Sequence, residues 1–150
     1  MFKLPVRIGL IALSVMSFSA VAAPLKEIPF QLSCKPSSGK FLGEVRGHYY
    51  MGAGGPESIY AMDYKITKLN GQSGGNKANL NMGHSKVPML GWENQIKSND
   101  DLKQDGQWHQ LSKILAKYFN GRDNIEVGFE FVFDKSGADP SCNVYKVLNP

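Results

Sequence analysis

Apolar and polar residues alternate along several short segments of the chain, and this period of two constrains the fold more than any other feature. Successive side chains of a β-strand point to opposite faces, so strict alternation indicates a strand with one buried and one solvated face. The pattern is clearest over residues 125–134, where apolar residues occupy every second position. It recurs over residues 27–34, 41–51, 58–68, 77–82 and 141–148, and more weakly over 87–93.

Alternation also assigns residues to faces. Within 58–68 it places Tyr60, Met62, Tyr64 and Ile66 together on the apolar face. Turn-forming residues separate the segments, and the glycine-rich stretch 52–56 is typical of a hairpin connection. Six or seven short strands joined in this way predict a mainly β protein, either an antiparallel β-sandwich or a small barrel.

Residues 107–119 break the alternation. Trp108, Leu111 and Leu115 line up at helical spacing instead. Asp105 stands where an N-cap residue would accept hydrogen bonds from the first helical amides. We therefore expect one α-helix near residues 107–119, covering a sheet or closing one of its ends.

Residues 1–22 have the three-part layout of a secretory signal peptide. Lys3 and Arg7 provide a positive start, residues 8–21 are mainly apolar, and small residues precede a cleavage point after Ala22. The apolar run is shorter than the ~20 residues that a spanning helix needs. We expect cleavage, a single domain over residues 23–150, a periplasmic or secreted location and no stable membrane insertion after cleavage.

The charge balance argues against a nucleic-acid partner. The net charge of +4 falls to about +2 without the leader, because two of the 17 basic residues leave with it. The remaining lysines and arginines are spread thinly along the chain, whereas nucleic-acid binders concentrate them in a stripe.

The chain has two cysteines, Cys34 and Cys142, one near each end of the mature sequence. Exported proteins enter an oxidising compartment in which such pairs form disulfides. We expect a Cys34–Cys142 bond between neighbouring first and last strands, closing a loop of roughly 100 residues.

Ligand-binding candidates come from the polar face of the strand at 41–51 and from aromatic residues beside polar turns. Arg46 suits a carboxylate or phosphate, and exposed flat rings suit sugars or a protein partner. The competing interpretation is a solvated face of mutually satisfied charges, with the rings covered by the second sheet or the helix. The candidates are Arg46, His48, Tyr50, Trp92, Trp108 and Tyr145.

Recognisable catalytic and metal-binding patterns are absent from the sequence. The histidines at 48, 84 and 109 lack zinc-site spacing, and no serine occupies a Gly-x-Ser-x-Gly elbow. Residues 134–139 resemble a calcium loop, but Ala138 stands where an oxygen ligand is needed. We therefore assign no catalytic residue, no metal and no cofactor.

Two functions fit these features. The first is an exported, non-catalytic binding protein for an envelope glycan or a protein partner, with an inhibitor or immunity-type protein as a special case. The second is a small secreted hydrolase acting on cell-envelope material, in which His48 or His109 works with a neighbouring carboxylate.

Overall fold

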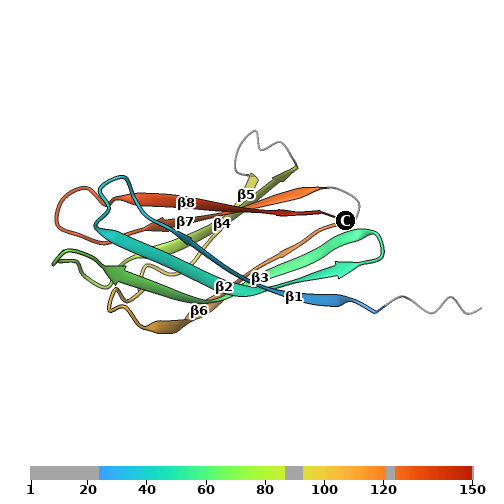
Figure 1. The fold of residues 1–150 in the computed structure, drawn as a ribbon, viewed down its shortest axis with the longest axis horizontal. Helices are drawn as coiled ribbons and strands as arrows, with labels where there is room; N and C mark the ends of the chain where they lie inside the picture. The colour runs from blue at the N-terminus through green and yellow to red at the C-terminus, as the bar shows by residue number, and fades with distance from the viewer. Residues whose placement is uncertain (1–23, 87–92, 121–123, 150) are drawn as a thin grey trace, which may run out of the picture.

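Two antiparallel four-stranded sheets pack face to face in the computed structural model, which describes residues 24–86, 93–120 and 124–149 (Figure 1). The first sheet has the order β1-β2-β3-β6, with β1 at Lys26–Cys34, β2 at Phe41–Gly52, β3 at Gly55–Lys68 and β6 at Trp108–Tyr118. The second sheet has the order β5-β4-β7-β8, with β5 at Glu93–Lys97, β4 at Asn79–Lys86, β7 at Ile125–Val132 and β8 at Ser141–Leu148. The predicted antiparallel sandwich is confirmed, with eight strands in the described ranges instead of six or seven. No helix in these ranges has the length and apolarity needed to cross a membrane.

Phenylalanine side chains fill the space between the sheets. Phe30 of the first sheet packs on Phe129 of the second with ring centroids 5.6 Å apart. Phe41 stacks on Phe133 at 4.9 Å, and Phe131 lies beside Phe133 at 6.0 Å. Burying one such side chain contributes about 1.5–3 kcal/mol relative to leaving it exposed. The alternating segments therefore form strands because their apolar faces meet in this core.

The disulfide joins the two layers at one edge of the sandwich. Cys34 ends β1 and Cys142 lies in β8, and their Cα atoms are 5.9 Å apart. Since β1 and β8 belong to different sheets, the bond clamps one sheet to the other. The predicted pairing is confirmed, and a buried disulfide of this kind is consistent with an oxidising compartment.

The prediction of a helix near residues 107–119 is wrong. This segment is strand β6, which pairs antiparallel with β3. Leu111 and Leu115 are buried while the three residues between them are exposed, because β6 carries extra residues opposite the Ala61–Asp63 step of β3. That irregularity separates the two buried leucines by four positions, which imitates helical spacing. Asp105 does cap a turn, and its Oδ1 accepts the Gln107 amide at 2.9 Å.

A β-bulge in β3 changes which side chains share a face. Gly47 pairs with Ala61 and Arg46 pairs with Asp63, so Met62 is an extra residue without an opposite partner. Ile59 and Ala61 are buried before the bulge, and Tyr64 and Ile66 after it. Tyr60 therefore lies on the outer face, and the expectation that it shares a face with Tyr64 and Ile66 is wrong.

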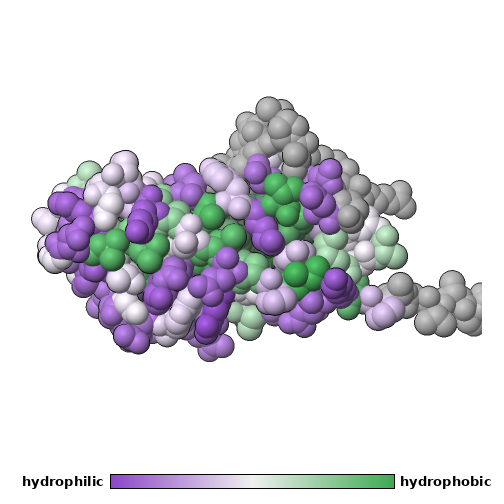
Figure 2. Space-filling model, in the orientation of Figure 1, coloured by the Kyte–Doolittle hydropathy of each residue, from purple (hydrophilic) through white to green (hydrophobic). Residues whose placement is uncertain are grey.

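The four edge strands carry features that discourage pairing with another chain. β1 contains Pro29, β6 carries its irregularity with the exposed Lys113, and β5 has five residues. Lys146 of β8 points inward, its Nζ 5.2 Å from the centroid of the Tyr49 ring. On the side of the molecule drawn in Figure 2, hydrophilic residues predominate and apolar ones form separate patches. The sheet faces, more than the edges, are the surfaces open to a ligand.

The disulfide should stabilise the sandwich by restricting the unfolded chain. We expect the Cys34→Ser, Cys142→Ser double variant to lose about 3–5 kcal/mol in the free energy of unfolding, measured by urea denaturation. Dithiothreitol should lower the stability of the wild type to that of the variant and leave the variant unchanged. Two titratable thiols in wild-type protein denatured without reductant would contradict the prediction.

Candidate functional site

The outer face of the first sheet gathers three of the predicted ligand-binding residues on a single strand. Arg46, His48 and Tyr50 alternate along β2 with residues that face the core. The register of the sheet places Asp63 of β3 opposite Arg46, and Tyr60 opposite His48. The face therefore has a charged half around Arg46 and an aromatic half around His48.

In the charged half, ion pairs and a tryptophan hold one another in place. Arg46 Nε donates to Asp63 Oδ2 at 3.0 Å, and its guanidinium lies 4.3 Å from the centroid of Trp108. Lys65 Nζ is 5.3 Å from the same ring and 2.6 Å from Glu44 Oε2. Trp108, also one of the predicted ligand-binding residues, lies on this face, but cations of its own chain already contact its ring.

The aromatic half is a cluster of four rings, His48, Tyr50, Tyr60 and Tyr118, which we call the aromatic cluster. His48 lies 5.1 Å from Tyr50 and 5.2 Å from Tyr60, and Tyr60 lies 6.1 Å from Tyr118 at an interplanar angle of 88°. Edge-to-face contacts of this kind are the preferred geometry of aromatic pairs. Tyr118 exposes 71% of its surface. Sequence reasoning missed Tyr60 and Tyr118 because the bulge and the irregular strand that turn them outward leave no local signal.

The tyrosine hydroxyls of the cluster are engaged in hydrogen bonds. Tyr50 donates to Glu27 Oε2 at 3.1 Å, and the hydroxyls of Tyr60 and Tyr118 share a hydrogen bond of 3.2 Å. Desolvation raises the pKa of Tyr50 above its ordinary value, and the hydrogen bond to Glu27 adds to the rise. The hydrogen bond with Tyr60 raises the pKa of Tyr118. Both phenols therefore remain hydrogen-bond donors at physiological pH.

A hollow of about 500 Å³ opens between the two halves. Gly47 lines it, and β3 passes so close there that a Cβ added to Gly47 would stand 1.8 Å from the Tyr60 carbonyl oxygen. Side chains of β1, β2 and β3 form the walls, some apolar and some charged. The lining residues are Glu27, Pro29, Phe30, Gln31, Arg46, Gly47, His48, Met62 and Asp63.

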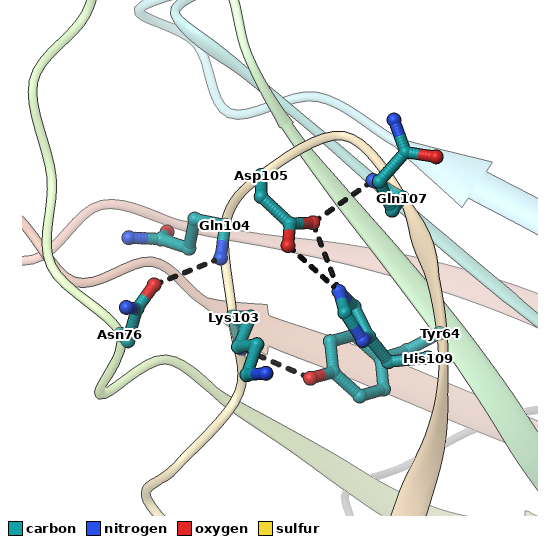
Figure 3. Close-up of polar contacts among 7 residues, drawn as sticks. All are labelled: Tyr64, Asn76, Lys103, Gln104, Asp105, Gln107 and His109. Atoms are coloured by element: carbon teal, nitrogen blue, oxygen red, sulfur yellow. Dashed lines mark hydrogen bonds and ion pairs between the residues drawn. The ribbon is translucent and has the colours of Figure 1, made fainter.

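A second, smaller pocket of about 240 Å³ lies beside β6 and includes His109 and Tyr64 among its lining residues. Figure 3 shows the Asp105 carboxylate between the Gln107 amide and the His109 ring, whose Nε2 is 2.9 Å and 3.0 Å from its two oxygens. The hydrogen bond to His109 is the main cause that lowers the pKa of Asp105. The Ser112 hydroxyl, also in this pocket, donates to Asp101 at 3.3 Å.

The remaining predicted residues do not join the face. Tyr145 alternates with buried residues of β8 and lies on the outer face of the second sheet. Two further predictions fall outside the described residues: Trp92 and the leader at 1–22. So does the weak strand expected at 87–93, apart from its last residue. Within the described ranges, no three His, Cys, Asp or Glu side chains are grouped to hold a metal ion.

Comparison with known proteins gives no relative. No family model, curated protein or solved structure matches the chain. The features that bear on function are therefore those of the site itself: a mixed polar and aromatic hollow on the face of a disulfide-linked β-sandwich.

Gly47 should be required for the close approach of β2 and β3. We expect Gly47→Ala to cost about 3 kcal/mol in the free energy of unfolding, because the added methyl group meets a backbone oxygen that has little freedom to move. Gly39→Ala is the control: an added Cβ meets no atom within 4 Å there, so the change costs only the left-handed backbone conformation, about 1 kcal/mol. Urea unfolding of both variants measures the difference, and equal losses would contradict the clash.

Asp105 should make stability depend on pH in the acid range. Its pKa is lower in the folded than in the unfolded protein, so its contribution is complete above the unfolded value of about 3.9 and disappears as pH falls through the folded pKa. We expect Asp105→Asn to be less stable than wild type at neutral pH and the gap to close in acid. Denaturation curves collected across this range test the prediction, and a gap independent of pH would contradict it. In a His109→Gln background, the stability difference caused by Asp105→Asn should be smaller, because the hydrogen-bond partner of the Asp105 carboxylate is absent.

Proposed function

We propose that this chain is an exported, non-catalytic binding protein that holds a glycan or a protein ligand of the cell envelope on the outer face of its first sheet. The observation that carries the proposal is the hollow of about 500 Å³ directly beside the aromatic cluster. Its volume is within the usual range for ligand sites, about 300–1,000 Å³. The leader-like residues 1–22 and the buried disulfide support a periplasmic or secreted location.

The face is pre-organised for binding. The Arg46–Asp63 bond, the guanidinium over Trp108 and the Tyr50–Glu27 bond fix the side chains around the hollow. A ligand then pays little to order them, which favours affinity. Since the edge strands carry features that discourage strand addition, recognition through this face is also more favourable than pairing along an edge.

The hydrolase remains a second candidate, favoured by one observation. His48 and His109, which line the two pockets described above, each have a carboxylate beside them: His48 Nδ1 is 3.6 Å from Glu27, and His109 Nε2 is 2.9 Å from Asp105. A carboxylate in this position orients an imidazole for proton transfer. Hydrolysis of envelope material that is lost in His48→Ala or His109→Ala would support this function over binding alone.

The binding function predicts that substitutions on the outer face remove ligand retention. Immobilised wild-type protein should retain a glycan from an array or a component of an envelope extract. Arg46→Ala and Tyr50→Ala should weaken that binding by about thirtyfold each, the effect of removing a central interface residue. Tyr145→Ala, on the opposite face, is the matched control and should bind as wild type does.

Circular dichroism should confirm that each variant is folded. Retention of no ligand by the wild type, or equal binding by all variants, would contradict the proposed function.

A further inference from the structure

We infer that the ligand is a saccharide with a free amino group, whose ammonium enters the hollow against Glu27 while a sugar ring lies on the exposed part of the aromatic cluster. This inference rests on the proposed function, because it uses the same face. It goes further by naming the chemistry that the face selects.

The charge of the hollow selects a cation. Two carboxylates, Glu27 and Asp63, line it together with one guanidinium, that of Arg46. Arg46 Nε is bonded to Asp63, so these two charges compensate each other. While the His48 imidazole beside it is neutral, Glu27 remains as an excess negative charge, which favours cationic groups over phosphates and carboxylates.

Two contacts orient the Glu27 carboxylate for binding a cationic group. The Tyr50 phenol donates to its Oε2, and His48 Nδ1 is 3.6 Å from its Oε1. A carboxylate offers about four acceptor positions, so these contacts orient the group without saturating it. An ammonium brings three donors, which fit the acceptor positions that remain on this carboxylate.

The aromatic cluster provides the place for the sugar ring. His48 lines the hollow, and its ring centroid is 5.2 Å from that of Tyr60. The Tyr60 ring is in turn 6.1 Å from that of Tyr118, so the three rings form a row that starts at the hollow. Tyr118 is the most exposed ring of the cluster and keeps a neutral hydroxyl for a sugar oxygen. Flat aromatic rings bury the apolar face of a sugar while polar groups bind its hydroxyls.

A lysine side chain of a protein partner also carries an ammonium group, but the structure favours the saccharide as the ligand. An extended peptide would be expected to add to a strand edge, and the edges of both sheets are protected by Pro29, by the irregular β6, by the short β5 and by Lys146. The hollow has the size of a small-ligand site, whereas a stable protein interface needs about 800 Å² on each partner.

A pair of matched sugars tests the inference. Calorimetry in low-salt buffer at neutral pH compares the glucosamine tetrasaccharide with its fully N-acetylated form, which has the same rings and no charge. We expect the amino form to bind at least about tenfold more tightly, the effect of a charge-assisted hydrogen bond. Glu27→Gln should remove this preference. Glu126→Gln, which removes a carboxylate from the second sheet, should keep it.

A separate variant, Tyr118→Ala, tests whether the sugar ring lies on the aromatic cluster. Tyr118→Ala should weaken the binding of both sugars by a similar factor, because it removes the ring contact and leaves Glu27 in place. Unchanged affinity for both sugars would overturn the placement of the sugar ring.

The remaining outcomes separate this inference from the proposed function. Equal affinity for the two sugars overturns the role of the ammonium, and tetralysine binding as tightly with the same dependence on Glu27 overturns the choice of a saccharide. If neither sugar binds while the outer face retains another envelope ligand, the inference fails and the proposed function stands. If the wild type retains no envelope ligand either, both fail.

Discussion

Packing of phenylalanine rings between the two sheets is the contact on which the rest of the structure depends. Phe30 on Phe129 and Phe41 on Phe133 join the layers through the middle of the core. The Cys34–Cys142 bond adds a covalent link at the edge where β1 and β8 meet. Because protein interiors are close-packed, the sheet above such a core is rigid, and the outward side chains of β2 and β3 keep fixed separations.

Departures from regular pairing create the candidate site. The bulge at Met62 turns Tyr60 outward, and the extra residues of β6 separate its two buried leucines. Gly47 lets β2 and β3 approach where a side chain would collide with the Tyr60 carbonyl oxygen. Bulges are frequent next to functional sites because they re-aim side chains that a regular sheet would bury. The hollow lies at this irregular point of the first sheet.

The ion pairs of the outer face contribute more to geometry than to stability. Arg46 and Asp63 expose 46% and 26% of their side chains, and exposed pairs are worth about 0–1 kcal/mol. Their effect is to hold the guanidinium over the Trp108 ring and to neutralise Asp63. Glu27, held by the neutral Tyr50 phenol, is then the carboxylate that gives the hollow its excess charge.

Local patterns of the sequence were sufficient for the mainly β architecture, the disulfide and the outward direction of Arg46, His48 and Tyr50, because alternation and cysteine placement can be recognised in each strand alone. The choice of a sandwich over a small barrel came from the structure. The helix near 107–119 and the face of Tyr60 were predicted wrongly, since an extra residue in a strand is recognisable only from the partner strand that it fails to match. Tertiary structure alone decided that Tyr60 and Tyr118 meet, that cations cover Trp108 and that Tyr145 lies on the opposite sheet. These outcomes depend on register and strand order, which come from packing between segments distant in the chain and not from the residues adjacent to each position.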